Sequence, residues 1–243
     1  MEKFFRYLGH KAGPSIRKGK WIYHSFFADK VQAIESEFLV GKELAINVLS
    51  EYQKLDDAET QRLISEIYRR LTDCLTNKKR KFQLTVIISP DLNAFALPGG
   101  FIFITNNLIK LLEYNPDRLA YVAAHEMTHV ILKHPLNLML SNYSLQMIEK
   151  FIRTRGAVGG LAKQAISGFI KNGYSQEKEL EADKYGVQLM KYARYNAHAA
   201  TEVLQKLSAL KDDQSEILNY FSTHPPASER IAAINHHLKN INT

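Results

Sequence analysis

Hydrophobic residues recur with helical spacing over most of the chain and with strand spacing only near its middle. Spacings of three and four residues predict amphipathic helices over Val31 to Tyr52 and Ala58 to Leu75. Alternation followed by an apolar run predicts a strand over Phe82 to Ser89. The chain therefore begins with helical segments and then enters a short β region.

Two shorter strands are expected around the turn Pro98-Gly99-Gly100, at Asn93 to Leu97 and at Phe101 to Ile104. Proline cannot donate a ladder hydrogen bond, and the glycines allow the chain to turn. From Thr105 onward the pattern is helical again. The prediction is an α+β fold, mostly α, with a small mixed β-sheet between helical halves.

A central helix is predicted to begin after Asn115-Pro116-Asp117, which combines a capping residue, a proline in the first helical position and an acid in the first turn. We expect it to run to His134, before Pro135. Its apolar residues point all round, which is typical of a buried helix: Leu119, Tyr121, Val122, Met127, Val130, Ile131 and Leu132. Polar residues within such a helix need a partner.

His125, Glu126 and His129 are the polar residues that stand out in this helix. The two histidines are four positions apart, so they project from one face and can bind one metal ion. Glu126 lies beside them, where it can reach a metal-bound water without binding the metal. The alternative is a pair of core histidines satisfied by separate hydrogen bonds. One Zn²⁺ per chain accounts for all three residues and is the interpretation we favour.

The acids of Ser175 to Tyr192 fall on two faces of an expected helix. One face is wholly polar, as on a solvated surface: Glu177, Glu181, Lys184, Gln188 and Lys191. Glu179 and Asp183 lie opposite, among small and apolar residues. We expect Glu179 to be the third metal ligand and Asp183 to accept a hydrogen bond from a ligating histidine. A buried acid pair matched to arginines is the alternative.

Composition narrows the class of protein. The 243 residues are 45% hydrophobic and 23% charged, which is typical of a globular domain. The single cysteine, Cys74, excludes an internal disulfide and a zinc site built from thiolates, and we expect it to be a buried apolar residue. No apolar run reaches the roughly 18 residues of a membrane span, and no signal-peptide core is evident. We therefore expect a cytoplasmic protein.

The net charge of +7 is concentrated near the N-terminus, where residues 1–30 carry seven basic residues against two acidic ones. We divide the chain into this basic arm, residues 1–30, and a single zinc-binding domain, residues 31–243. Peripheral contact of the arm with an anionic membrane is one interpretation, and packing of its aromatic residues on the domain is the other. The charge lies in an arm rather than on a broad face, so we expect no specific nucleic-acid partner.

Three of these motifs, in order, resemble the gluzincin metallopeptidases of family forty-eight, which includes HtpX, the CAAX prenyl proteases and Oma-like proteins. They are residues 93–100, the zinc helix 125–129 and the third-ligand segment 179–183. A fourth segment, Thr223-His224-Pro225-Pro226 with Arg230, is similar to the family's C-terminal His-Pro segment. The resemblance covers roughly residues 80 to 235, and the lack of membrane spans favours the soluble, Oma-like and periplasmic branches.

The resemblance implies a zincin-like fold, with the edge strand of the sheet facing the active-site cleft, and a zinc endopeptidase that acts on extended or unfolded protein segments. Glu126 would be the general base. His224 would either stabilise the oxyanion or cap the metal as an inhibitory ligand. Arg230 would reach the site or face solvent. The substrate would add to the strand that contains Asn93, Ala94, Phe95 and Ala96.

Two other classes of function remain as alternatives. A metal-containing chaperone-like or scaffold protein would keep the fold with latent catalysis, but it has no use for Glu126 beside the metal. A nucleic-acid-binding protein is favoured only by the basic arm and the isoelectric point of about 9.3. We expect no role at the site for the remaining histidines: His134 at a helix C-terminus, where a cation is favoured, and His236 and His237 on a polar terminal helix.

Overall fold

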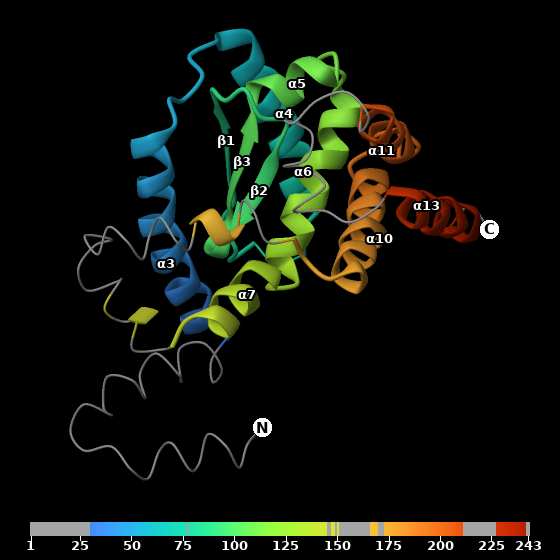
Figure 1. Ribbon diagram of the computed structural model, residues 1–243. Helices are drawn as coiled ribbons and strands as arrows, with labels where there is room; N and C mark the ends of the chain where they lie inside the picture. The colour runs from blue at the N-terminus through green and yellow to red at the C-terminus, as the bar shows by residue number, and fades with distance from the viewer. Residues whose placement is uncertain are drawn as a thin grey trace, which may run out of the picture.

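The computed structural model describes residues 30–76, 78–144, 147–148, 150, 166–169, 173–210 and 227–241 of the chain. These residues form a mostly helical protein around a small sheet, as predicted (Figure 1). The expectations for the arm before Lys30 and for His224 lie outside the described residues. Among the helices that the model describes, none is long and apolar enough to cross a membrane.

The sheet has three strands in the order β1-β3-β2: β1 (Gln83–Ile87), β2 (Ala94–Leu97) and β3 (Phe101–Thr105). β1 runs parallel to β3, and β2 runs antiparallel to it. The sheet is therefore mixed, and β2 lies at one edge. This confirms the predicted strands and the predicted position of the Asn93 to Leu97 segment within the sheet.

Side chains of β2 and β3 alternate between the two faces of the sheet, because successive residues of a strand point in opposite directions. On one face they pack with α3 (Lys30–Glu51) and α7 (His134–Asn142), and this core includes Val40, Leu44, Phe95, Leu97, Phe101, Phe103, Leu136 and Met139. On the other face they pack with α4 (Ala58–Asp73) and α6 (Pro116–Ile131), with Ile64, Ile67, Ala94, Ala96, Ile102, Ile104, Ala120 and Met127 in the core. Helices thus cover both faces.

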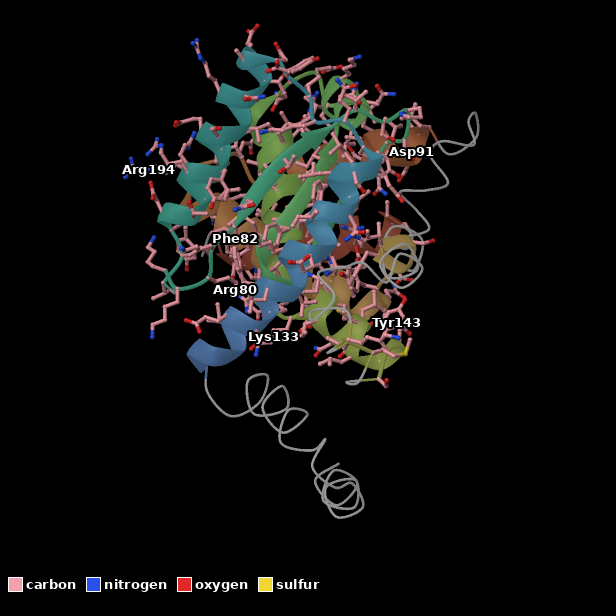
Figure 2. The ribbon with its side chains drawn as sticks, turned by 90° about the vertical axis from the view of Figure 1, so that its left-hand side faces the viewer. Arg80, Phe82, Asp91, Lys133, Tyr143 and Arg194 are labelled. Atoms are coloured by element: carbon pink, nitrogen blue, oxygen red, sulfur yellow. The ribbon has the colours of Figure 1, made fainter. Side chains whose placement is uncertain are left out.

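A tight turn, η1 (Pro98–Gly100), joins β2 to β3 and lies against α3. Gly99 has φ 79° and Gly100 has φ 98°, a backbone region that favours glycine. The Gly99 N–H donates a hydrogen bond of 3.1 Å to Glu37 of α3. Arg80 donates two more to the same carboxylate, at 2.8 and 2.9 Å, and lies beside α3 where that helix crosses in front of the sheet (Figure 2). This buried ion pair fixes the turn to α3.

α6 is the central helix of the fold. The side chain of Asn115 caps it by accepting hydrogen bonds from the N–H groups of Asp117 and Arg118. Every residue from Leu119 to Val130 is buried, as the all-round apolar pattern predicted. α6 lies between the sheet and the C-terminal helices (Figure 1), which are α10 (Gln176–Tyr192), α11 (Ala199–Ala209) and α13 (Ala227–Ile241). A short helix, α5 (Asn106–Leu111), connects β3 to α6.

Two sequence predictions are wrong. The central helix does not run to His134: α6 ends at Ile131, Lys133 adopts φ 61°, and His134 begins α7 with Pro135 in its first turn. Proline is accommodated at a helix start, where its missing N–H has no partner to lose, so here it marks a beginning rather than an end. Cys74 is exposed instead of buried, because it lies just past the end of α4.

Candidate metal centre

Three buried side chains from two helices converge at the centre of the fold. α6 supplies His125 and His129, which are 2% and 0% exposed, and α10 supplies Glu179, which is 0% exposed. The two histidine Nε2 atoms are 3.0 Å apart. Glu179 places Oε2 3.4 Å from Nε2 of His125 and Oε1 3.3 Å from Nε2 of His129. The predicted ligand set is therefore assembled in space.

These spacings fit a tetrahedral metal ion. Bonds of about 2.0–2.1 Å in tetrahedral geometry place neighbouring ligand atoms about 3.3 Å apart. The two Nε2 atoms lie 3.0 Å apart, and each lies 3.3 or 3.4 Å from one of the two oxygens of Glu179, so the carboxylate faces both imidazoles at about this spacing. Among the described residues, one group of histidine, cysteine and acidic side chains could hold a metal ion, and it consists of His125, His129 and Glu179. Two imidazoles and one carboxylate with a further position open are the donor set of catalytic zinc sites.

Asp183 lies next to the first ligand, as predicted. Its Oδ1 atom is 2.9 Å from Nδ1 of His125, the ring nitrogen that faces away from His129. The hydroxyl of Tyr121 donates to the same oxygen at 2.8 Å. A carboxylate at this position holds the proton of a ligating histidine on the outer nitrogen and fixes the orientation of the ring.

Arg230 of α13 is 1% exposed and bonds to the two buried acids of α10, Glu179 and Asp183. Its guanidinium donates to Asp183 at 2.7 and 2.8 Å and lies 3.0 Å from Oε2 of Glu179. It also donates to the hydroxyl of Tyr121 at 3.1 Å. Of the two positions expected for Arg230, the structure therefore has the one at the site. The alternative to a metal site was a buried acid pair matched to arginines, and the pairing of Arg230 with both acids is part of that arrangement.

The charges of the cluster nevertheless favour a cation. Glu126, Glu179 and Asp183 are all buried, and Arg230 is the one buried guanidinium facing them in the described part of the chain. Burial lowers the pKa of His125, but hydrogen bonds to Asp183 and Glu179 and their charges outweigh it and raise the pKa to about 9. The raised pKa indicates a negative potential around the His125 imidazole. Metal binding requires both imidazoles to be neutral, and a divalent ion would then balance the excess of two carboxylates over the guanidinium.

Glu126 follows His125 directly in α6 and is 2% exposed. Burial, with the charges of Glu126 and Glu179, raises the pKa of Tyr174 well above its ordinary value, so the two carboxylates lie near that phenol. The Tyr174 ring stacks on His129, with centroids 4.2 Å apart and an angle of 21°. Sequence reasoning missed Tyr174, since it lies just outside α10 and carries no periodic signal.

His134 is a second residue that sequence reasoning missed. The sequence predicts a histidine at a helix C-terminus with no role at the site, but His134 is 4% exposed and its Nδ1 lies 2.9 Å from Nδ1 of His129. Its Nε2 lies 3.6 Å from the half-exposed carboxylate of Glu181. Burial and the nearby charge of Lys178 lower the pKa of His134. The structure corrects the expectation that this histidine is remote from the site.

The expected substrate strand lies against the metal helix. β2 packs on α6 and is an edge strand of the sheet that the model describes. Asn93 is 3% exposed, and Ala94, Phe95, Ala96 and Leu97 are all buried. Phe95 stacks on Phe103, so both Phe95 and Leu97 belong to the core. Only the backbone of this strand is then left to recognise a substrate.

The site has the arrangement of a metallopeptidase. Two histidines lie one turn apart, a second helix supplies a glutamate, and an acid lies beside the first histidine. Comparison with known families agrees. The model of peptidase family M48 matches residues 57–238, so the chain belongs to this family. The resemblance seen in the sequence is confirmed.

Named relatives are proteases. The chain is 27% identical over 172 residues to the mitochondrial metalloendopeptidase OMA1 of Schizosaccharomyces pombe, covering 70% of this chain and 51% of that protein. It is 27% identical over 150 residues to the metalloprotease YcaL of Escherichia coli, covering 60% and 58%. It is 26% identical over 194 residues to the beta-barrel assembly-enhancing protease of Escherichia coli, covering 73% and 39%. The chain thus spans about half the length of these relatives.

Proposed function

We propose that this protein is a zinc-dependent endopeptidase that cleaves extended or unfolded protein segments. The observation that carries the proposal is the buried cluster of His125, His129 and Glu179, whose ligand atoms lie close enough together to hold one metal ion, with the buried Glu126 next to His125 in α6. Relatives named as metalloproteases support the same activity.

Each residue of the cluster has a role in this proposal. His125, His129 and Glu179 hold the zinc ion, which when bound polarises a carbonyl group and makes water acidic near neutral pH. Glu126 takes a proton from the attacking water and returns it to the leaving amine. Asp183 orients His125, and Arg230 holds Asp183 and Glu179 in place. Arg230 is thus a positioning residue.

Substrate binding is proposed at the edge of β2. An extended peptide can add to an exposed sheet edge through backbone hydrogen bonds. The side chains of Ala94, Phe95 and Ala96 are buried, so they give little scope for selecting particular substrate side chains. We infer loose sequence selectivity and a preference for unfolded segments.

Two further proposals concern parts of the chain that the structure does not describe, and a third concerns the location of the protein. His224 is proposed to lie over the metal, either as an oxyanion donor or as an inhibitory ligand. The arm, residues 1–30, is proposed to contact anionic membrane surfaces, which its excess of basic residues supports. A single cysteine fits a reducing compartment, and we propose a cytoplasmic location.

The test compares the wild type with Glu126→Gln, which fills the same space but cannot accept a proton. The variant should keep its zinc and its fold and lose at least about 100-fold in turnover, the low end of a general-base contribution. Peptides released from an unfolded protein are identified by mass spectrometry. Equal cleavage by both proteins would contradict the proposal. A wild type that binds zinc and unfolded protein but releases no peptides would favour the scaffold alternative.

A further inference from the structure

His134 contacts the outer nitrogen of a proposed metal ligand. Its Nδ1 lies 2.9 Å from Nδ1 of His129, and the two rings meet edge to face, with centroids 5.0 Å apart and an angle of 68°. On its other side, Nε2 of His134 faces Glu181 at 3.6 Å. The three residues therefore form a chain from the metal position to the surface of α10.

The direction of the hydrogen bond follows from the chemistry of imidazole. His129 turns Nε2 toward Glu179 and His125, so metal binding there requires the proton of His129 to be on Nδ1. That N–H can only donate, and the atom it meets is Nδ1 of His134, which must accept. The proton of a neutral His134 is then on Nε2, the nitrogen that faces the Glu181 carboxylate.

We propose that His134, supported by Glu181, is a positioning residue that fixes the tautomer and the orientation of His129 for metal binding. The inference rests on the proposed metal site. It gives each ligating histidine its own acceptor, since Asp183 serves His125 in the same way. The ligand and both supporting acids come from five residues of α10: Glu179, Glu181 and Asp183 at alternate positions.

The backbone supports this role. Five residues along an unbroken helix correspond to a rotation of about 140°, so in a continuous α6 residue 134 would point away from residue 129. The chain instead breaks at Lys133, which adopts a left-handed conformation with φ 61°. For a residue with a side chain this conformation is unfavourable. The break brings the His134 ring back against His129.

Two substitutions separate the two nitrogens of His134. The side-chain oxygen of asparagine can take the place of Nδ1, and the terminal atoms of glutamine can take the place of Nε2. His134→Asn therefore keeps the acceptor for His129, and His134→Gln keeps only the contact with Glu181. A role in packing alone would make both variants equally weak.

Zinc affinity is measured by competition with a chromophoric chelator, with zinc as the only added ligand. His134→Gln should weaken binding about 10–100-fold, as loss of an outer partner does. His134→Asn should stay within about fivefold of the wild type, and Glu181→Gln should lose about two- to fivefold, the range of an exposed ion pair. Glu181→Gln should add nothing in the His134→Asn background. Glu177→Gln, an exposed acid on the same face of α10, is the matched control and should bind as the wild type.

Wild-type affinity in His134→Gln, or equal losses in His134→Asn and His134→Gln, would overturn the inference. Glu181 lies on the surface, so Glu181→Gln does not threaten folding. If this variant has an effect no larger than that of Glu177→Gln, Glu181 has no part in the inference. A wild type without zinc, or undiminished zinc in His129→Ala, would instead refute the proposed metal site itself.

Discussion

Arg230 joins two acids of the metal centre from a third helix. Its guanidinium is 1% exposed and bonds to Asp183 and Glu179. Burial acts to lower the pKa of Arg230, but its interactions with Tyr121, Asp183 and Glu179 outweigh it and raise that pKa well above its ordinary value. Burial acts to raise the pKa of Asp183, but the Arg230 charge outweighs it and holds that pKa well below its usual range. The ion pair is therefore charged on both sides throughout the physiological range.

Replacing Arg230 should destabilise the fold strongly. Arg230→Met leaves the buried Asp183 carboxylate without its cation, and breaking a buried pair in this way costs about 3–5 kcal/mol. The free energy of unfolding is measured by urea titration in excess chelator, so that metal loss does not contribute. Arg118→Met is the control, because Arg118 pairs with Glu113 and Glu202 at the surface. It should lose less than about 1 kcal/mol. Equal losses in the two variants would contradict this account of Arg230.

Sequence reasoning predicted the residues whose positions follow from helical periodicity. His125, His129, Glu179 and Asp183 were identified because each stands on the buried face of a helix where an acid or imidazole needs a partner. His134 was misplaced, because its contact with His129 depends on a break in the chain that residue types alone do not reveal. Spacing in the sequence thus predicts the metal ligands more readily than it predicts the residues that support them.

At the scale of elements, the backbones of α3 and the turn η1 lie in close contact. A Cβ atom added at Gly41 would lie 1.8 Å from the carbonyl oxygen of Pro98. Gly99 in turn lies under the backbone of Phe38, and its N–H bonds to Glu37. Only glycine at position 41 lets α3 rest directly on the turn between β2 and β3.

Gly41→Ala should therefore lower the free energy of unfolding, although alanine favours helices. The gain in helix propensity is about 1 kcal/mol, whereas forcing α3 away from a backbone carbonyl costs at least the 1–3 kcal/mol that is typical of overpacking. Denaturant unfolding measures the difference against Lys42→Ala, an exposed neighbour on the same helix. A Gly41→Ala variant as stable as Lys42→Ala would show that the helix moves aside freely.

Most elements could be predicted from the sequence, because strands follow an alternation of apolar and polar positions and amphipathic helices follow apolar spacings of three and four residues. The strands at residues 83–87, 94–97 and 101–105 lie within a residue or two of their predicted limits. The sequence places the end of α6 three residues too late, because Pro135 resembles a stop signal. A proline just inside the next helix and one just after a helix end look alike in the sequence, and only the left-handed Lys133 separates them.

At the scale of the whole molecule, every described site residue lies between Asn93 and Arg230, on or next to the sheet, α6, α7, α10 and α13. Removing residues 1–20 should therefore leave zinc content and cleavage of a short peptide unchanged. Metal analysis and a peptide assay of the truncated protein measure both. Loss of zinc on truncation would show that the arm belongs to the domain and would contradict the division at residue 30.

The most direct test of the central claim is the zinc content of the purified protein and of His129→Ala. The account predicts one zinc per chain in the wild type and loss of zinc in the variant, because His129 supplies one of the three ligands that the cluster offers. Chelation should abolish peptide cleavage, and added zinc should restore it. A natively purified protein without zinc, or a His129→Ala variant with full zinc content, would contradict the account.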